Sequence, residues 1–228
     1  MTPRVVSLVP SVTETLLAWG MRPVACTRFC EQPDLPHVGG TKDPDVDAIV
    51  ELAPDLVVVD EEENRREDHD ALVARGLVVH VLAVRDLTGL DAQMDGLAST
   101  VGARWEPIGR RPEPAPTRRA WVPIWKRPWM ALGEPTYGSA LLRAIGVANV
   151  AAAEGAYPEM DPAAARAAGV DLVIAPSEPY PFAERHRAEL AEAADDVRFI
   201  DGRDLVWWGT RTRGALERLA LALRSSDR

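Results

Sequence analysis

The fold is decided by the stretch Pro54-Asp55-Leu56-Val57-Val58-Val59, which the chain echoes as Val170-Asp171-Leu172-Val173-Ile174-Ala175. A second pair of similar stretches, Leu16–Val24 and Leu142–Val150, precedes these two in the same order. Self-similarity of this kind indicates two related lobes. Each apolar run is short and rich in β-branched residues, which is typical of a buried parallel strand.

Strands and helices alternate through the first half of the chain. Ser11-Val12-Thr13-Glu14 has the pattern of a capping box, so we expect a helix that begins there and ends at Gly20. The other predicted elements are the strands Val5–Val9, Val24–Thr27, Leu56–Val59 and Leu77–Val84 and the helices Asp45–Ala53, Asn64–Arg75 and Leu90–Ala103.

The second half repeats this alternation after a proline-rich segment. Trp105–Arg119 contains Pro107, Pro112, Pro114 and Pro116, which disfavour a continuous helix and predict an irregular connector. The elements predicted after it are the strands Ala120–Trp125, Asn149–Ala152, Leu172–Ala175 and Val197–Asp201 and the helices Thr136–Ile145, Asp161–Ala168, Phe182–Ala194 and Arg211–Leu223.

This alternation predicts an α/β fold with two Rossmann-like lobes, each with a parallel central sheet, a ligand cleft between the lobes and a shortened proline-rich connector. We place the N-terminal lobe at 1–104, the connector at 105–119 and the C-terminal lobe at 120–228. Ligands of open α/β sheets bind beyond the carboxyl ends of the strands. The residues that follow each strand are therefore the candidates for function.

Composition narrows the classes of partner. The net charge of −9 repels a nucleic-acid backbone, so we expect no nucleic-acid partner. No run of about 18 apolar residues is present, so we expect no membrane insertion. The start Met1-Thr2-Pro3-Arg4 lacks the pattern of a secretory signal, which predicts a cytoplasmic protein if Met1 is the true start. Cys26 and Cys30 are expected to be free thiols in a reducing compartment.

Aromatic and arginine side chains gather after the predicted strands of the second lobe. The candidates for ligand contact there are Trp125, Trp129, Tyr180, Phe182, Trp207, Trp208 and Arg211. Rings on loops suit a flat, partly apolar ligand held by stacking, and an arginine adds a charge or a cation–π contact. The alternative is that the tryptophans pack inside the lobe with their ring N–H groups satisfied.

The first lobe offers a more polar set of candidates, namely Ser11, Phe29, Lys42, Glu62 and Asn64. The run Asp60–Glu63 is suited to a cation or a metal chelate, but a structural role is favoured. In that role Asp60 caps the next helix and three glutamates in its first turn complement the helix dipole.

Patterns typical of catalysis are missing. His69 and His186 fall in charged helical stretches, where a solvated helix face is expected. No histidine pair has metal-site spacing, and no nucleophile elbow is present. The sequence therefore favours binding over catalysis, with no cofactor of the protein's own.

Several segments together resemble one family. These are Val5-Val6-Ser7-Leu8-Val9-Pro10-Ser11-Val12-Thr13-Glu14, Val38–Asp45, Ala53–Val57, Ser177–Phe182 and Trp207–Arg211. They resemble the helical-backbone (class III) substrate-binding proteins of ABC importers, and most closely the cobalamin-binding branch. The resemblance implies a monomer that clamps a corrinoid or ferric siderophore between its lobes. It places Phe29, Trp207, Trp208 and Arg211 on the ligand-facing walls.

The resemblance also implies docking to an ABC permease through one acidic residue on each lobe. Asp47 matches that role in the first lobe, whereas the second-lobe position is Ala163, so Glu159 or Asp161 nearby would replace it. Asp60 stands where such a binder can have tryptophan. The long helix that joins the lobes in this family is replaced by the proline-rich connector.

Three hypotheses follow from the sequence. The first is non-catalytic binding of a metal chelate, and it predicts that Trp208→Ala or Arg211→Ala weakens binding by about 1–3 kcal/mol, because both residues are expected at a loop rim. The second is a cytoplasmic tetrapyrrole- or metal-handling enzyme or chaperone that reuses the same scaffold. The third is an interaction module whose proline-rich connector recruits a partner.

Overall fold

The computed structural model describes residues 2–110 and 113–224, which form two compact units. Unit 1 comprises the described residues up to Val84, together with Gly89–Pro107 and Gly209–Arg211. Unit 2 comprises Arg85–Thr88, the described residues from Ile108 to Trp208, and those that follow Arg211. Each unit contains a four-stranded sheet in which every pairing is parallel. The predicted α/β class with two sheet-containing lobes is confirmed.

The sheet of unit 1 has the order β2-β1-β3-β4. Its strands are β1 (Val5–Ser7), β2 (Ala25–Cys26), β3 (Leu56–Asp60) and β4 (Val79–Leu82). In the register of the sheet, Val57 pairs with Val6 on one side and with Val79 on the other. The duplicated apolar stretch forms β3, which is buried along its whole length because it lies inside the sheet and is covered on both faces.

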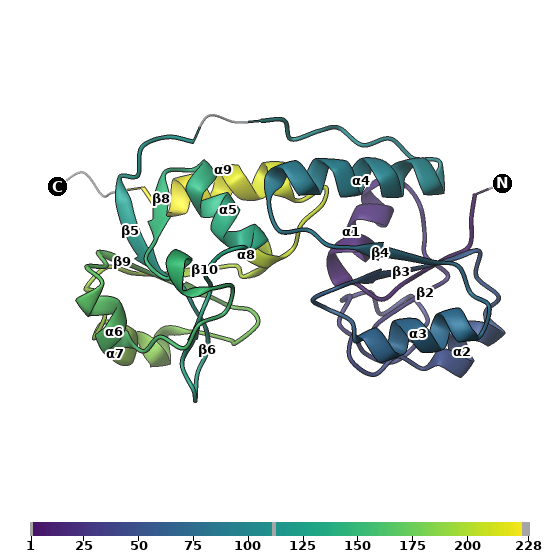
Figure 1. Cartoon of the computed structure of the whole chain (residues 1–228), viewed down its shortest axis with the longest axis horizontal. Helices are drawn as coiled ribbons and strands as arrows, with labels where there is room; N and C mark the ends of the chain where they lie inside the picture. The colour runs from purple at the N-terminus through teal and green to yellow at the C-terminus, as the bar shows by residue number, and fades with distance from the viewer. Residues whose placement is uncertain (1, 111–112, 225–228) are drawn as a thin grey trace. The chain divides into compact units, whose positions relative to one another are not determined.

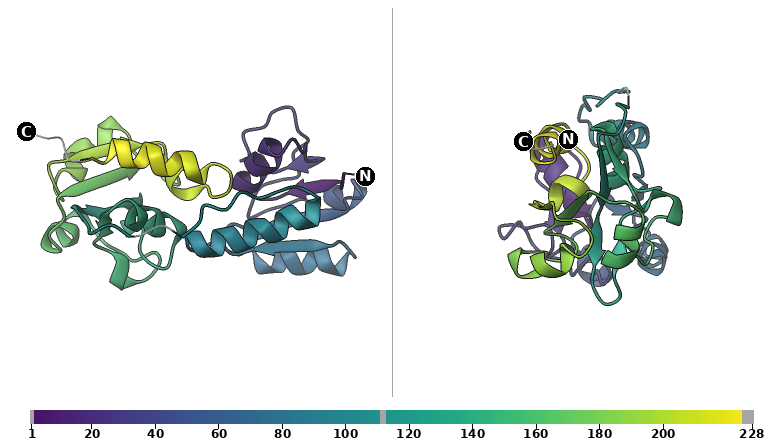
Figure 2. Two further views of the ribbon diagram at one scale, coloured as in Figure 1. Left: turned by 90° about the horizontal axis from the view of Figure 1, so that it is seen from above. Right: turned by 90° about the vertical axis from the view of Figure 1, so that its left-hand side faces the viewer.

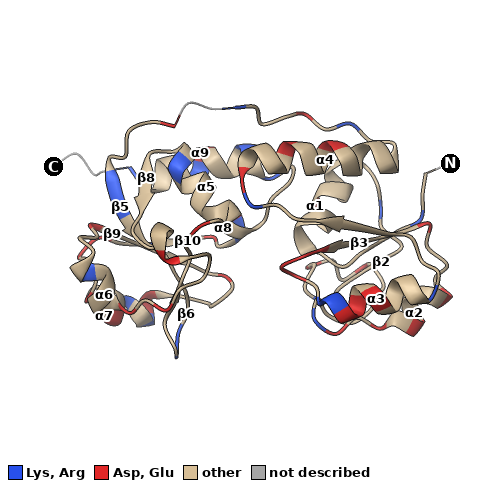
Figure 3. Ribbon diagram, in the orientation of Figure 1, with Lys and Arg blue, Asp and Glu red and all other residues tan. Residues whose placement is uncertain are grey.

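Helices cover both faces of this sheet (Figure 1). α1 (Pro10–Ala18) and α4 (Leu87–Val101) lie on one face, and α2 (Val46–Glu51) and α3 (Arg66–Ala74) lie on the other. Ile49 of α2 and Leu72 of α3 are fully buried against Val57 and its neighbours. Acidic and basic side chains both occur on α3, as expected for its solvent-facing side (Figure 3).

Two predicted helix starts in unit 1 are wrong. α1 begins at Pro10 rather than at Ser11, and Val9 is its N-cap without a side-chain hydrogen bond. Proline suits the first helical position because its ring fixes φ and its missing N–H needs no partner there, so no capping box forms. The helix after β3 begins at Arg66 with Arg65 as its N-cap, so Asp60 is not its cap.

The sheet of unit 2 has the order β10-β9-β5-β8. Its strands are β5 (Arg118–Trp121), β8 (Val147–Asn149), β9 (Leu172–Pro176) and β10 (Val197–Ile200). The second copy of the duplicated stretch forms β9, again inside the sheet and buried throughout. β6 (Pro123–Trp125) and β7 (Met130–Ala131) form a separate antiparallel pair.

The single strand predicted over Ala120–Trp125 is therefore wrong, because the chain leaves the parallel sheet after Trp121 and enters the β6–β7 pair. Pro123 carries no N–H to donate to a continuing ladder, which favours this break.

Helices also cover both faces of the sheet of unit 2 (Figures 1 and 2). α5 (Tyr137–Ala144), α8 (Arg203–Val206) and α9 (Thr212–Ala222) lie over one face, and α6 (Pro162–Ala167) and α7 (Arg187–Leu190) lie over the other. A short 3-10 turn, η1 (Ala152–Glu154), follows β8. The predicted cap of α6 is confirmed, since the Asp161 carboxylate accepts the Ala164 N–H at 2.7 Å.

The long helix predicted over Phe182–Ala194 is wrong. Only the 3-10 turn η2 (Glu184–His186) and the single turn of α7 form there. Phe182 is drawn into the core of unit 2, and the His186 ring accepts the Ala183 N–H at 3.1 Å. Helical structure consequently begins only at Glu184.

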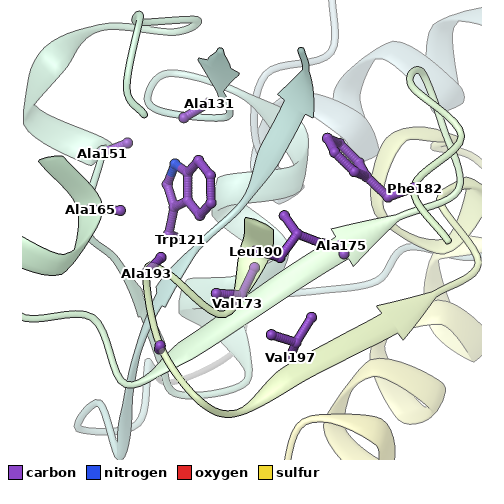
Figure 4. Close-up of a cluster of buried hydrophobic side chains, with 11 residues drawn as sticks. Trp121, Ala131, Ala151, Ala165, Val173, Ala175, Phe182, Leu190, Ala193 and Val197 are labelled. Carbon is purple, nitrogen blue, oxygen red and sulfur yellow. The ribbon is translucent and has the colours of Figure 1, made fainter. Parts of the chain in front are cut away.

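The main core of unit 2 is built around Trp121 (Figure 4). Trp121 is fully buried among small side chains that include Ala151, Ala165 and Val173. Its ring N–H has no hydrogen-bond partner, so packing alone holds the indole. Phe182 closes the same cluster.

The connector is irregular at 103–110 and at 113–117, as its prolines predict. Pro112 lies outside the described residues. The later part is fixed to unit 2, because Thr117 donates its N–H to Gly146 O at 2.9 Å and Arg143 pairs with Glu113 at 2.7 Å. Among the described helices, none combines the length and the apolar character that a membrane crossing requires.

Candidate ligand-binding site

The carboxyl ends of the parallel strands define one edge in each unit. Edge 1 consists of the loops that follow β1, β2 and β3 in unit 1, and edge 2 consists of the segments that follow β5, β9 and β10 in unit 2. Parallel strands bring their carboxyl ends to the same side of a sheet, where ligands of α/β proteins bind.

Edge 2 carries a continuous cluster of aromatic rings. Trp125 meets Tyr180 edge-on with centroids 5.6 Å apart, and Tyr180 lies 4.7 Å from Phe182. Phe182 stacks on Trp129 at 6.0 Å with an interplanar angle of 4°, and Trp129 contacts Trp121 at 5.6 Å. The structure thus brings together four of the predicted ligand-binding residues.

Burial changes along this cluster from the core to the surface. Trp121 is 0% exposed and Phe182 is 4% exposed, whereas Trp125 is 47% exposed. Trp129 and Tyr180 are intermediate. The inner rings therefore fix the outer ones in place, and Trp125 presents a large apolar surface that the fold itself does not use. Phe182 belongs to the core, and its predicted contact with a ligand stays a prediction.

A basic and a neutral group complete the cluster. The Lys126 ammonium lies 5.6 Å from the centroid of Trp129, which is cation–π distance, and also pairs with Glu189. His186 contacts both Tyr180 and Phe182 at 5.6 Å and is buried, so the predicted solvated position of this histidine is wrong. Because His186 Nδ1 accepts a backbone N–H, the proton of the neutral ring lies on Nε2.

A histidine that binds a metal ordinarily donates its other ring N–H to an oxygen, and His186 does the opposite at Nδ1. Across the part of the chain that the structure describes, no group of three or more His, Cys, Asp or Glu side chains is arranged to hold a metal ion. The chemistry that edge 2 offers is therefore ring stacking with a nearby positive charge.

Trp207 belongs to edge 2 through a hydrogen bond. Its ring N–H donates to Glu178 Oε2 at 3.1 Å, and Gly202 N–H donates to Ser177 Oγ at 2.9 Å. A Cβ at position 202 would meet Glu178 N at 2.4 Å, so glycine permits the close approach of these two loops. The loop after β9 and the segment after β10 are consequently tied together.

Trp208 and Arg211 are the two remaining candidates of the second half of the chain. Trp208 is 6% exposed, so its predicted place on a loop rim is wrong. Arg211 belongs to unit 1, where it pairs with Glu14 of α1 at 2.9 Å. Gly209 makes this docking possible, because a Cβ there would lie 2.1 Å from Thr15 Oγ1 and its φ is +112°.

Edge 1 is organised by Asn64, which is buried. Its amide donates to Thr41 O at 2.9 Å and to Leu8 O at 3.2 Å, and its carbonyl oxygen accepts Asp60 N–H at 2.8 Å. One side chain therefore fixes the ends of β1 and β3 and the Thr41 loop. Asn64 was predicted only as a ligand contact, and these hydrogen bonds show that it also has a structural role.

Asp60 ends β3 as a buried carboxyl group. Its Oδ1 accepts the N–H groups of Glu62 and Glu63 at 2.9 and 3.2 Å, which shapes the turn between β3 and α3. Burial raises the pKa of Asp60 to about 7, and the two backbone N–H donors only partly oppose this. The carboxyl group is thus close to half protonated near neutral pH.

The remaining candidates of edge 1 differ in exposure. Phe29 is 51% exposed and lies 4.8 Å beneath the guanidinium carbon of Arg28. Lys42 donates to the backbone oxygen of Glu62, so the structure brings these two predicted residues together. Ser11 is buried within the first turn of α1.

The two predicted docking residues are both exposed. Asp47, in the first turn of α2, pairs with Arg75. Glu159 lies opposite Met130 in an isolated antiparallel bridge.

Sequence reasoning missed the partners that hold these candidates. Lys126 and Glu178 contact predicted residues and lie in the candidate segments after the strands, but they were not singled out, and His186 was predicted to be solvated. The position of His186 in the sequence did not indicate that it would contact Tyr180 and Phe182. Those contacts depend on the 3-10 turn η2, whereas the sequence pattern predicted a regular helix.

Comparison with known proteins supports the resemblance found in the sequence. Residues 5–106 match the family model described as periplasmic binding protein. The chain resembles the periplasmic substrate-binding proteins. Among curated proteins, no sequence matches this chain.

Solved structures extend the likeness over both units. The periplasmic vitamin B12 binding protein BtuF of Vibrio cholerae matches with a TM-score of 0.77 and 19% identity over 97% of this chain and 96% of its own. The periplasmic heme binding protein HutB of Vibrio cholerae matches with a TM-score of 0.78 and 20% identity over 99% of this chain and 100% of its own.

A periplasmic heme binding protein from Pseudomonas aeruginosa matches with a TM-score of 0.79 and 19% identity over 97% of this chain and 92% of its own. At these identities the likeness establishes the fold.

Proposed function

We propose that this chain binds a metal chelate with extended apolar surface, namely a corrinoid, a heme or a ferric siderophore, without chemical conversion. The observation that carries the proposal is the aromatic cluster of edge 2, with the exposed ring of Trp125 supported by Tyr180. Rigid rings that need no reorganisation are suited to stacking on a flat ligand. The similar structures include vitamin B12 and heme binding proteins.

The positive charge beside the cluster narrows the ligand further. Lys126 lies over Trp129 and pairs with Glu189, so an acidic group of a ligand would have to share or exchange that partner. Heme carries propionates, and many ferric siderophores carry acidic groups, which the Lys126 ammonium would attract. On edge 1, we propose the exposed ring of Phe29 for an apolar contact.

The direct experiment is a thermal-shift panel with cyanocobalamin, hemin and a set of ferric siderophores. We expect one class to raise the melting temperature by several degrees at saturating concentration, because a ligand that binds only the folded state stabilises it. Absorption titration of that ligand then gives the dissociation constant. If no chelate of the panel raises the melting temperature, the proposal is wrong.

A matched pair of variants separates the site from general surface effects. Trp125→Ala removes an exposed ring of the cluster, and Leu221→Ala removes an apolar side chain that is 65% exposed on α9. We expect only the first to reduce the thermal shift. An equal reduction by both would place the ligand elsewhere.

We further propose that delivery to an ABC permease uses Asp47 and Glu159. Both carboxylates are exposed, although Asp47 already pairs with Arg75, so a basic permease pocket would have to exchange that partner. Asp47→Asn and Glu159→Gln should reduce transport in cells that depend on this protein while leaving the dissociation constant of the ligand unchanged. A change in the dissociation constant would contradict this docking role.

A further inference from the structure

Cys26 and Cys30 are a pair of buried thiols outside the proposed ligand site. Cys26 is the last residue of β2, and Cys30 follows after a turn in which Cys30 N–H donates to Thr27 O at 3.1 Å. The two cysteines pack together in a small buried cluster with Leu35. Neither is part of a disulfide in the structure.

The surroundings of the two sulfurs are unequal. The hydroxyl groups of Thr13, from α1, and Thr27, from the turn, both lie 3.2 Å from Cys30 Sγ. Thr13 has one hydroxyl proton and also lies 3.2 Å from Val9 O, so it can turn toward the sulfur when the sulfur is charged. Both threonines are fully buried, which makes these donors stronger than they would be in water.

These contacts favour a thiolate at Cys30 and a thiol at Cys26. The donated hydrogen bonds lower the pKa of Cys30 to about 6, with the Cys26 thiol as the largest contributor. The same hydrogen bond raises the pKa of Cys26. A thiolate beside a protonated thiol is the arrangement in which one sulfur attacks and the other resolves.

We propose that Cys26 and Cys30 form an intramolecular disulfide when the protein meets hydrogen peroxide. The Cys30 thiolate attacks one peroxide oxygen and releases hydroxide, which leaves a sulfenic acid on Cys30. Cys26 then loses its proton and attacks the Cys30 sulfur, and the sulfenic oxygen departs as water. The two sulfurs together lose two electrons, and the peroxide is reduced to two molecules of water.

The disulfide would close a short ring around the turn that carries Arg28 and Phe29. Phe29 N–H already bonds to Thr27 Oγ1 at 3.3 Å, so the threonine that supports Cys30 also supports the backbone of Phe29. After oxidation, a covalent link between Cys26 and Cys30 would therefore hold the two ends of the turn, in addition to its hydrogen bonds. Because both sulfurs are buried, a small oxidant is favoured over a bulky disulfide reagent.

The experiment exposes the reduced full-length protein to hydrogen peroxide, then unfolds it in the presence of an alkylating reagent and determines its mass. We expect the wild type to lose both alkylation sites and two hydrogen atoms, and to regain both sites after reduction with dithiothreitol. Cys26→Ser should retain a sulfenic acid that dimedone captures at residue 30, whereas Cys30→Ser should give much less adduct at residue 26.

Thr27→Val is the control that tests the proposed chemistry, because valine has the shape of threonine without the hydroxyl. We expect it to slow oxidation of Cys30 several-fold at neutral pH and to shift the pH profile of alkylation upward. Two alkylated cysteines in the wild type, after a treatment that fully oxidises dithiothreitol, would overturn the proposal. Sulfinic acid or intermolecular dimers without the internal disulfide would also overturn it.

Discussion

Edge 1 and edge 2 stand at equivalent places in two similar sheets and have opposite chemistry. At edge 1, Asn64 and the Asp60 carboxyl group satisfy backbone groups, so the polar side chains are largely consumed by the fold. At edge 2, aromatic rings extend from the buried Trp121 to the exposed Trp125. The difference indicates that the polar side chains of edge 1 supply a rigid frame beside the exposed Phe29, while edge 2 presents a cluster of several rings that a ligand can cover.

The same difference separates residues that maintain the fold from residues that are free to bind. Trp121 and Trp125 lie in the same aromatic cluster, yet one is fully buried and the other half exposed. Substitutions at these positions and at edge 1 therefore test the comparison directly.

Trp121→Ala should have the largest effect on stability. Removal of a fully buried indole leaves a cavity, and we expect the free energy of unfolding to fall by about 3–5 kcal/mol. Urea denaturation followed by circular dichroism measures this. Trp125→Ala is the matched control and should change the free energy of unfolding by less than about 0.5 kcal/mol. Equal losses of the free energy of unfolding in both variants would contradict the distinction between Trp121 as a core residue and Trp125 as a surface residue.

The buried Asp60 carboxyl group of edge 1 should make the free energy of unfolding depend on pH. Its folded-state pKa of about 7 lies above the ordinary value of 3.8, so the folded protein holds this proton over a range where the unfolded chain has lost it. The free energy of unfolding should therefore fall as the pH rises from about 4 to about 7, by up to about 4 kcal/mol from this group.

Asp60→Asn keeps an oxygen acceptor and cannot ionise, so it should flatten this part of the pH profile and be more stable than the wild type at pH 8. Urea denaturation at a series of pH values measures both effects. Parallel profiles for the two proteins would show that Asp60 does not titrate in this range.

Asn64→Ala should have the next largest effect, because it leaves buried backbone groups of Leu8, Thr41 and Asp60 without their partner. We expect a loss of about 2–3 kcal/mol in the free energy of unfolding. Lys42→Ala, at an exposed side chain of the same edge, is the control and should cost less than about 0.5 kcal/mol. A wild-type stability for Asn64→Ala would contradict the role of edge 1 as a frame.

Strands could be predicted where a short apolar stretch of sequence is by itself enough to indicate a buried strand. The stretches 54–59 and 170–175 predicted β3 and β9, because a buried interior strand needs a continuous apolar run. The proline content of 105–119 likewise predicted irregular structure. The start of α6 was also predicted correctly, because it depends on a local pattern in which Asp161 forms the capping hydrogen bond.

Errors arose where distant contacts decide the outcome. Phe182–Ala194 has a helical pattern, but Phe182 packs on Trp129 and His186 caps the chain, so a long helix does not form. Ser11 has the pattern of an N-cap, but the proline before it already begins the helix. The pairing of Arg211 with Glu14 also depends on a residue far away in the sequence.

The sequence indicated which types of residue make up the candidate site, but not how they are arranged in space. Aromatic residues after the strands of the second half indicated stacking, and Trp125, Trp129, Tyr180 and Phe182 do meet. Their order from core to surface follows from packing that the sequence does not display.

We propose that the exposed end of the edge 2 cluster binds the chelate. The most direct measurement is the dissociation constant, by absorption titration, of the chelate that stabilises the wild type most, for the wild type, Trp125→Ala and Leu221→Ala. We predict that Trp125→Ala weakens binding by about 1–3 kcal/mol, which is roughly 5-fold to 160-fold, and that Leu221→Ala binds like the wild type. Wild-type affinity in a folded Trp125→Ala protein would contradict the claim.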